Sequence, residues 1–343
     1  MRTQVSLASY TTFGIGGPAE YFVEVATERE LEEAVRFSVE QSLPVFVMGM
    51  GSNLLVSDRG FPGVVIRMTG EEVESVDEGE SVLVIAEAGK SWDDLVALCV
   101  ERGWWGMENL SGIPSSVGAS AVQNIGAYGT EVSTLVEWVE VYDRTTHTTA
   151  RLPRSACLFG YRDSIFKQEE GKGLIVMKVA YRLRATGSPV LGYKDLEEYH
   201  QTIRPIVSLS DMRTAVLAVR SGKFPKHGEA GTAGSFFKNP VVSREIARDV
   251  QARFPEAPVF PQIDGSSKLS AAWIIDHVLH LRGVREGDVG TWPTQALIVV
   301  NYGHAQAQDV LRFIERIRTE CRLALGVELT PEVVFVGDDL HHA

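Results

Sequence analysis

The 343-residue chain contains little cysteine, and its cysteines are not spaced as a ligand set or a disulfide framework. Cys99, Cys157 and Cys321 lie far apart, with no Cys-x-x-Cys pair among them. This pattern excludes a disulfide-rich secreted scaffold and a zinc ribbon. None of the 8 histidines falls at a metal-ligand spacing, so we expect no metal site. We interpret the three cysteines as buried free thiols.

Long apolar runs and an excess of positive charge are also missing. No segment reaches the roughly 18 apolar residues of a membrane helix, and the N-terminal M-R-T-Q-V-S-L-A-S-Y has no signal core. We therefore expect a soluble, cytoplasmic protein with no membrane partner. The net charge of -12 argues against nucleic acid as a partner, because phosphate backbones require a clustered basic face. A phosphorylated metabolite is compatible with this charge wherever a few Lys or Arg residues converge.

The composition that is present, 44% hydrophobic and 23% charged, is that of a globular protein of two or three domains. Strand and helix patterns mix along the chain, which predicts an α+β fold. The T-E-R-E at 27–30 predicts a capping box between strands at 19–26 and 44–49. We place a domain boundary near Lys223. The other strands are expected at 64–66, 82–86, 136–142, 174–183, 235–238 and 296–301, with a closing pair at 327–329 and 333–336. The other helices are expected at 92–102 after a Ser91 cap, from a Ser210 cap to Gly222, at 244–254, at 271–281, and in a long segment ending at Gly326.

Two glycine-rich, nearly uncharged segments stand out. Residues 49–53 (G-M-G-S-N) follow a strand, and successive small residues there can present backbone N–H groups to a phosphate. Taken alone the segment is more simply a tight turn, since it is neither a G-x-G-x-x-G fingerprint nor a Walker A loop. Residues 110–130 are rich in Gly, Ser and Ala, and we interpret them as a loop that lies close against a ligand. Together the two loops indicate an elongated anionic cofactor such as a dinucleotide.

Three polar positions could carry chemistry. Arg162 in Y-R-D-S-I-F-K either pairs with Asp163 in a surface turn, which spacing alone favours, or presents its fork to a carboxylate. Glu332 at a strand start is either a rim residue or a buried acid with a raised pKa. In G-T-A-G-S-F-F-K-N-P, residues 231–240, Ser235 lies either at a solvated corner or in a polar pocket.

The motifs taken together resemble one known family. F-G-I-G-G, G-M-G-S-N-L-L, G-I-P-S-S-V-G-A-S-A-V-Q-N-I-G-A-Y-G, Y-R-D-S-I-F-K, G-S-F-F-K-N-P and P-E-V-V-F-V-G occur in this order over about 11–337. The order and the motifs are similar to those of the UDP-N-acetylenolpyruvoylglucosamine reductases, flavoenzymes of bacterial peptidoglycan precursor synthesis. P-V-L-G-Y-K-D-L at 189–196 resembles the tyrosine-bearing loop of the longer class of this family, with Tyr193 as the tyrosine.

The resemblance implies a fold and a domain order. A two-part FAD-binding unit of the vanillyl-alcohol-oxidase type, about 13–185 overall, would comprise residues 1–66 and 67–222. An α+β substrate-binding domain would follow at 223–343. The implied cofactors are non-covalent FAD and NADPH, the substrate is UDP-N-acetylglucosamine enolpyruvate, and the family indicates a monomer.

The resemblance also assigns residues to roles. Arg162 and Glu332 would stabilise the charge that develops on the substrate, and Ser235 would donate the proton. Tyr193, Lys223, Asn239 and Gln295 would hold the substrate. The residues that would meet the cofactor are Gly49, Gly51, Ser52, Asn53, Ile113, Pro114, Gly118, Gln123, Asn124, Gly126, Ala127, Tyr128 and Arg220, of which Tyr128 and Arg220 also match positions lining the substrate cavity. Met50 and the Ser115–Ser116 pair vary within otherwise matching loops.

Two rival interpretations stay open at this point. A flavin-dependent alcohol or sugar oxidase of the same cofactor fold would often tether its FAD through a histidine in the first glycine loop, and residues 49–55 contain none. A nucleotide-binding regulatory module would need the loops but not Arg162, Ser235 and Glu332 together. Lys238 has no assigned role.

Overall fold

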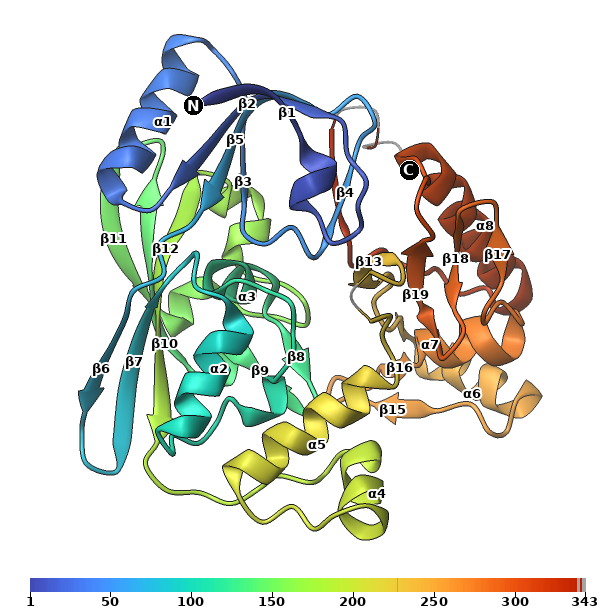
Figure 1. The fold of residues 1–343 in the computed structure, drawn as a ribbon. Helices are drawn as coiled ribbons and strands as arrows, with labels where there is room; N and C mark the ends of the chain where they lie inside the picture. Colours follow the sequence, from blue (N-terminus) through green and yellow to red (C-terminus); the bar gives the residue numbers. More distant parts are fainter. Residues whose placement is uncertain (227, 338–339, 341–343) are drawn as a thin grey trace. The chain divides into compact units, whose positions relative to one another are not determined.

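The chain folds into two compact units whose segments alternate along the sequence. The computed structural model describes residues 1–226, 228–337 and 340. Unit 1 comprises Met1–Val5, Ala19–Met50 and Pro62–Gly222, and unit 2 comprises Ser6–Pro18, Gly51–Phe61 and Lys223–Ala343 (Figure 1). The first glycine loop therefore contributes Gly49 to unit 1 and Gly51 to unit 2. The three-part division at 66 and 222 stays a prediction.

Unit 1 is built on two sheets that share one hydrophobic core. The four-stranded sheet has the order β1-β2-β5-β3, and the five-stranded sheet is antiparallel with the order β11-β10-β12-β7-β6. Side chains from both sheets, such as Ile66 and Val84, belong to the same buried cluster. The strands are β1 (Arg2–Ser6), β2 (Pro18–Val25), β3 (Val45–Met48), β5 (Phe61–Met68), β6 (Val73–Asp77), β7 (Ser81–Glu87), β10 (Val136–Asp143), β11 (Thr148–Pro153), β12 (Leu174–Arg184) and the short pair β8 (Gly126–Ala127) and β9 (Thr130–Glu131).

Among the α-helices that the structure describes in unit 1, all except the one at Lys194–Thr202 begin at side-chain caps. The predicted capping box is confirmed at α1 (Glu28–Glu40), where the Glu30 N–H donates to Thr27 Oγ1 and the Thr27 N–H donates to Glu30 Oε2. Ser91 caps α2 (Trp92–Glu101), as predicted. The helices α4 (Lys194–Thr202) and α5 (Leu209–Ser221) pack on one another beside a small apolar cluster that includes Met212 (Figure 1).

Two expectations for unit 1 are wrong. The cap of α5 is Ser208 rather than Ser210, because Ser208 is still extended and its Oγ accepts the Asp211 N–H at 3.1 Å. The segment at 110–130, predicted as a loop, contains α3 (Val117–Gln123), because Ser116 caps it and Val117 and Ala121 pack into the core. The low charge of this segment is explained at least in this helix by burial.

Unit 2 is a small α+β domain. An antiparallel sheet with the order β13-β19-β18-β17 is covered by α8 (Ala307–Leu325), whose Phe313 and Ile317 join the core of this unit. The predicted end of this helix at Gly326 is confirmed, since Gly326 is left-handed with φ of 65°. The elements are β4 (Leu54–Val56), β13 (Gly231–Ser235), β14 (Val241–Val242), α6 (Arg244–Arg253), β15 (Val259–Pro261), β16 (Ser267–Leu269), α7 (Ala271–Trp273), β17 (Arg285–Glu286), β18 (Val289–Trp292), β19 (Gln295–Asn301) and β20 (Val334–Val336).

Three expectations for unit 2 require correction. The strand expected at 235–238 instead ends at Ser235, because Gly234 has φ of 81° and the pairing with β19 shifts register there. No strand forms at 327–329, and β20 pairs in parallel with β4 instead. The helix expected at 271–281 changes after Trp273 into a π-helical turn, Ile274–Val278. Short 3-10 turns occur at Leu7–Tyr10, Glu108–Leu110, Val132–Thr134, Arg154–Cys157, Ile165–Lys167 and Glu169–Gly171.

Candidate functional site

Gly49, in unit 1, lies directly against the cap of α3. A Cβ added to Gly49 would come within 2.1 Å of Ser116 Oγ. Ser116 Oγ accepts the N–H of Ala119 and so holds the start of α3. Only a residue without a side chain lets the end of β3 approach the second glycine loop this closely.

Gly51, Ser52 and Asn53 belong to unit 2 and leave their amides available. Within the part of the chain that the structure describes, no carbonyl or side chain accepts from these three N–H groups. Gly51 adopts φ of 67°, the left-handed turn that glycine favours. Consecutive amides of this kind form a concave site for a phosphate, so the loop fits the pyrophosphate of FAD.

The second glycine loop is held from both sides. Trp92 donates its backbone N–H to Ser115 O and its Nε1–H to Leu110 O, both at close range (2.8 and 2.9 Å). Ile113 and Pro114 lie between these two anchors, and Ile113 O accepts the Ser115 N–H. These hydrogen bonds therefore hold the backbone around the predicted cofactor residues Ile113 and Pro114 in place.

Three further cofactor residues predicted in the second glycine loop are Gly118, Gln123 and Asn124. Gly118 lies on α3, where a Cβ would come within 2.9 Å of Ala88 Cβ, so the glycine permits close packing. Gln123 Oε1 accepts Lys167 Nζ at 2.7 Å. The side chain of Asn124 is buried: its Nδ2 donates to Gly160 O, and its Oδ1 accepts the Ser133 N–H. This side chain is therefore used within the protein.

Arg162 is held against the carbonyls of the second loop. Its Nη1 and Nη2 donate to Asn124 O and Gly126 O at 3.3 and 2.6 Å. Gly126 and Ala127 form the short strand β8, which fixes the second of these carbonyls. Arg162 itself adopts φ of 54°, and Lys167 Nζ donates to its carbonyl at 3.0 Å. The expected surface turn with Asp163 is present at Gly160–Asp163, yet the guanidinium faces the loop.

Ser235 and Glu332 come from neighbouring segments of unit 2. Ser235 ends β13, and the next carbonyl, Phe236 O, accepts the N–H of Glu332 at 2.8 Å. Phe236 and Phe237 are 0% and 1% exposed, so the end of the strand is anchored in the core. Asn53 Nδ2 donates to Glu332 O at 3.2 Å. Within unit 2 the structure therefore brings together Ser235, Glu332 and Asn53 of the first glycine loop.

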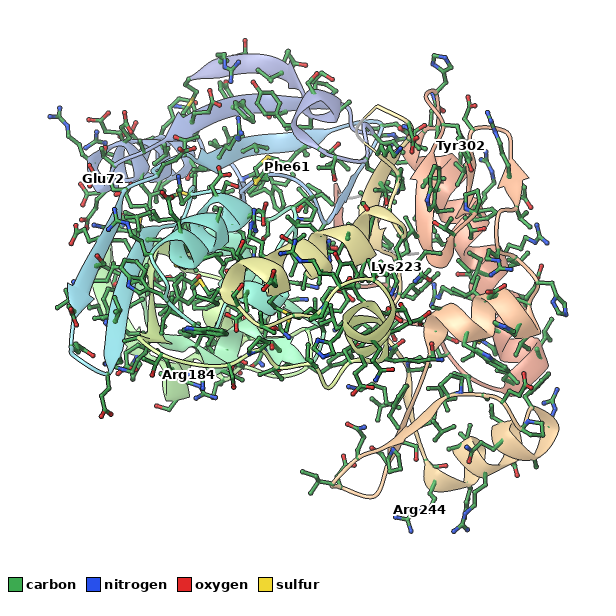
Figure 2. The ribbon with its side chains drawn as sticks, turned by 60° about the horizontal axis from the view of Figure 1, so that its bottom comes forward. Phe61, Glu72, Arg184, Lys223, Arg244 and Tyr302 are labelled. Carbon is green, nitrogen blue, oxygen red and sulfur yellow. The ribbon has the colours of Figure 1, made fainter. Side chains whose placement is uncertain are left out.

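Three predicted substrate residues lie in unit 2 and one lies in unit 1. Lys223 begins the last segment of unit 2 (Figure 2), and its carbonyl accepts Thr294 Oγ1. Asn239 Oδ1 accepts the Ala271 N–H at 2.9 Å, and Gln295 begins β19. In unit 1, the ring of Tyr193 packs edge-on against that of Tyr128, with centroids 5.2 Å apart.

A charged network behind the second loop was missed by sequence reasoning. Asp93 accepts Arg213 Nη1 and Nη2 at 2.6 and 2.8 Å, and its Oδ1 also accepts the Gly112 N–H at 2.6 Å. Arg220 Nε donates to Gly112 O at 3.1 Å. The sequence signal for this network was the spacing of Arg213 and Arg220 along one helix. The carboxylate they face, Asp93, lies in α2, far away in the sequence.

The pKa values of Asp93 and Arg220, at the two ends of this network, are both lowered, but for different reasons. Burial pushes the pKa of Asp93 upward, but the hydrogen bonds from Arg213 and Gly112 outweigh it, so the pKa lies below its usual value. Burial lowers the pKa of the Arg220 guanidinium, and Tyr128 and Asp93 counteract part of that shift. Asp93 therefore stays ionised and pins the peptide that precedes Ile113.

Metal-ligand clusters and membrane-spanning helices are both absent from the residues that the structure describes. Among them, no group of three or more His, Cys, Asp or Glu side chains could hold a metal ion. None of their helices is long and apolar enough to cross a membrane.

Comparison with known proteins points to one family over the whole chain. Residues 19–150 match the family model of the FAD binding domain, and residues 226–336 match that of the C-terminal domain of UDP-N-acetylenolpyruvoylglucosamine reductase. The reductase of this name from Pseudomonas aeruginosa is 40% identical over 335 residues, covering 97% of this chain and 98% of its own. That from Escherichia coli is 38% identical over 332 residues, covering 97% and 96%. The crystal structure of the reductase from Thermus caldophilus has a TM-score of 0.69 and 30% identity, covering 97% and 98%.

Proposed function

Because the chain belongs to the family of UDP-N-acetylenolpyruvoylglucosamine reductases, we propose that it reduces UDP-N-acetylglucosamine enolpyruvate to UDP-N-acetylmuramate with NADPH. Non-covalent FAD is the cofactor, and the first glycine loop fits its pyrophosphate through the amides of Gly51, Ser52 and Asn53. When bound, FAD supplies hydride chemistry, accepting a hydride from NADPH and passing it to the terminal alkene carbon of the substrate.

The residues of the chain handle the charge and the proton. As the alkene π bond breaks, the electron pair moves onto the carbon that bears the carboxylate. The Arg162 guanidinium pairs with that carboxylate, and Glu332 in its acid form donates a hydrogen bond to the same developing charge. Ser235 Oγ then gives its proton to this carboxylate-bearing carbon, which completes the lactyl ether, and solvent restores the serine proton.

One observation carries this assignment in the structure: the hydrogen bond between the Glu332 N–H and Phe236 O. It supports a common role for Ser235 and Glu332, because it joins the segments on which the proton donor and the acid lie. Tyr193, Lys223, Asn239 and Gln295 would hold the nucleotide and diphosphate end of the substrate. We also propose that the protein is a monomer and acts in the cytoplasm. Sedimentation tests its oligomeric state, and cell fractionation tests its location.

The test is an anaerobic absorbance experiment on the FAD-loaded protein. NADPH should bleach the oxidised flavin band, and UDP-N-acetylglucosamine enolpyruvate should restore it in the absence of oxygen. A flavin that is bleached by an alcohol or sugar and restored only by oxygen would instead identify an oxidase. A flavin that NADPH fails to bleach would overturn the proposed reaction.

A further inference from the structure

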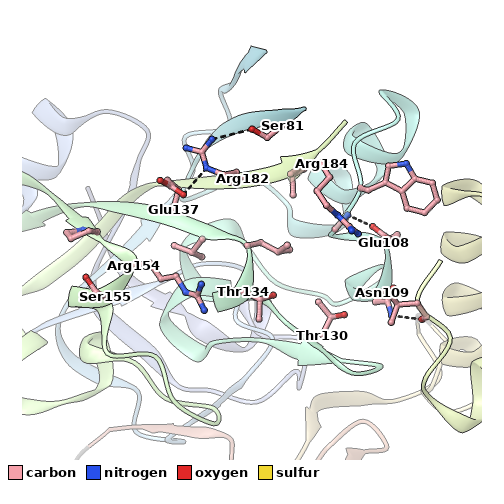
Figure 3. Close-up of a pocket in the computed structure, with 17 residues that line it drawn as sticks. Ser81, Glu108, Asn109, Thr130, Thr134, Glu137, Arg154, Ser155, Arg182 and Arg184 are labelled. Atoms are coloured by element: carbon pink, nitrogen blue, oxygen red, sulfur yellow. Dashed lines mark hydrogen bonds and ion pairs between the residues drawn. The ribbon is translucent and has the colours of Figure 1, made fainter. Parts of the chain in front are cut away.

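Unit 1 contains a cavity of about 810 Å³ that none of the predicted site residues lines (Figure 3). Its walls come from β10, β12, the turn at Arg154–Cys157 and the segment from Trp105 to Asn109. The cavity is large enough for a nucleotide-sized molecule. It therefore requires an explanation separate from the reaction.

The cavity carries an excess of available positive charge in a chain whose net charge is -12. Arg182 is committed, since its Nε donates to Glu137 Oε2 at 3.0 Å and it also pairs with Glu78. Arg154 and Arg184, both labelled in Figure 3, are exposed, and among the described residues neither guanidinium has an ion pair or a side-chain hydrogen bond. These two groups can bind an anion without first breaking a protein contact.

The other carboxylate of the lining, Glu108, is bonded to a backbone amide of the cavity wall. Glu108 is 2% exposed, and its Oε2 accepts the Gly106 N–H at 2.6 Å. Beside it, Trp105 adds a large planar ring to the lining, and the backbone at Gly187 covers part of that ring. A planar base and an anionic group are the two features such a lining can recognise.

Asn109 links the cavity to the tyrosine-bearing segment. It is 2% exposed, and its Nδ2 donates to Tyr128 O at 3.0 Å and to Val190 O at 3.3 Å. Tyr128 packs on the ring of Tyr193. A ligand that moves Asn109 would therefore shift the segment that carries Tyr193.

We propose that this cavity binds a nucleoside monophosphate or a similar organic phosphate, attracted by the positive charge that Arg154 and Arg184 give to its lining, and that its occupancy acts through Asn109 on Tyr193. Binding stands independently of the reaction. The effect on substrate affinity rests on the proposed function.

The experiment titrates adenosine 5′-monophosphate into the FAD-loaded protein by calorimetry, with inorganic phosphate as the probe that lacks a base. The wild type should bind the nucleotide saturably and more tightly than phosphate. In the Arg154→Ala/Arg184→Ala variant the Kd for the nucleotide should rise by about tenfold or more, because the lining loses two positive charges. Arg151→Ala is the matched control, since Arg151 is exposed on the nearby β11 but does not line the cavity.

Coupling is read from substrate kinetics and from proteolysis. The nucleotide should change the KM for the enolpyruvyl substrate in the wild type but not in Asn109→Ala, and it should alter cleavage within residues 189–196 of the wild type. Absence of saturable binding, or an equal Kd in the double variant and in Arg151→Ala, would overturn the site. Binding that changes neither KM nor cleavage would overturn the coupling. If the protein does not turn over the enolpyruvyl substrate, the proposed function fails, while the Kd comparison still decides the site.

Discussion

The backbone N–H of Glu332 donates a 2.8 Å hydrogen bond to the carbonyl of Phe236, the residue after Ser235. The bond uses only main-chain atoms, so the hydroxyl of Ser235 and the carboxyl group of Glu332 are positioned without using either side chain. Phe236 and Phe237 are buried beneath it and hold the segment in the core of unit 2. Each side chain can therefore be altered while the geometry of the backbone is retained.

Ser235→Ala should separate the two half-reactions. Reduction of the flavin by NADPH should be unchanged, whereas its reoxidation by the enolpyruvyl substrate should slow by about 10²–10⁴-fold, the usual contribution of a positioned proton donor. Stopped-flow absorbance measures both steps. Ser210→Ala, on the exposed side of α5, is the control and should leave both rates unchanged. A Ser235→Ala enzyme with normal reoxidation would show that the proton comes from another group.

Arg162→Lys should impair the same step for a different reason. The guanidinium reaches Asn124 O and Gly126 O with two nitrogens, and a lysine ammonium cannot reproduce that planar fork. We expect kcat/KM for the enolpyruvyl substrate to fall by about 10²–10³-fold, as when one transition-state donor is removed. Steady-state kinetics with Arg151→Lys as the control tests this. A loss confined to the NADPH step would contradict the assignment to the substrate carboxylate.

Local signals in the sequence predicted much of the fold. The capping box at Thr27, the Ser91 cap and the Gly326 end of α8 are correct because each depends on residues within one helical turn. Long-range pairing could not be read in this way. β20 pairs with β4 rather than with residues 327–329, because the partner comes from a segment far away in the sequence.

The candidate site shows the same division. Resemblance to a family supplied Arg162, Ser235 and Glu332, and spacing alone favoured ordinary roles for Arg162 and Glu332. Asp93 escaped notice because its partners, Gly112 and Arg213, lie on other elements and no local motif connects them. Its role follows only from the fold.

Gly49→Ala should weaken FAD binding through a clash with Ser116 Oγ. The new Cβ would come within 2.1 Å of that oxygen, so the hydroxyl must rotate away and release the Ala119 N–H, a cap worth about 1 kcal/mol. The Kd for FAD, measured by fluorescence, should rise, and Ser116→Ala added to Gly49→Ala should recover part of the loss by removing the clashing atom. Gly222→Ala is the control, because a Cβ there meets nothing closer than 3.7 Å. No recovery in the double variant would indicate that the clash is not the cause.

The three thiols should be inert in the folded protein. Burial raises the pKa of Cys99 to about 12, of Cys157 to about 11 and of Cys321 to about 12, so almost no thiolate exists at pH 8. A colorimetric disulfide reagent should label none of them in buffer and all three in concentrated guanidinium chloride. Rapid labelling of native protein would contradict their burial.

Asp93→Asn should change stability in a pH-dependent way. The asparagine keeps the shape and can still accept the Gly112 N–H, but it loses the ion pair with Arg213. Since the pKa of Asp93 is lowered in the folded protein, its contribution is present above the unfolded pKa of about 4 and is lost as the pH falls through the folded value. The wild type should exceed the variant by about 1–2 kcal/mol at pH 7, a modest figure because the side chain is partly exposed.

Urea unfolding between pH 7 and about pH 3 measures this gap, which should shrink toward zero at the acid end. Asp94→Asn is the control, because Asp94 lies on the same turn of α2 but is exposed. The Asp93 variant should also bind FAD more weakly, since Gly112 directly precedes Ile113 and Pro114 in the second glycine loop. A gap that grows as the pH falls would contradict the ionised state of Asp93, and an unchanged Kd for FAD would show that the network stabilises α2 and α5 without positioning the cofactor loop.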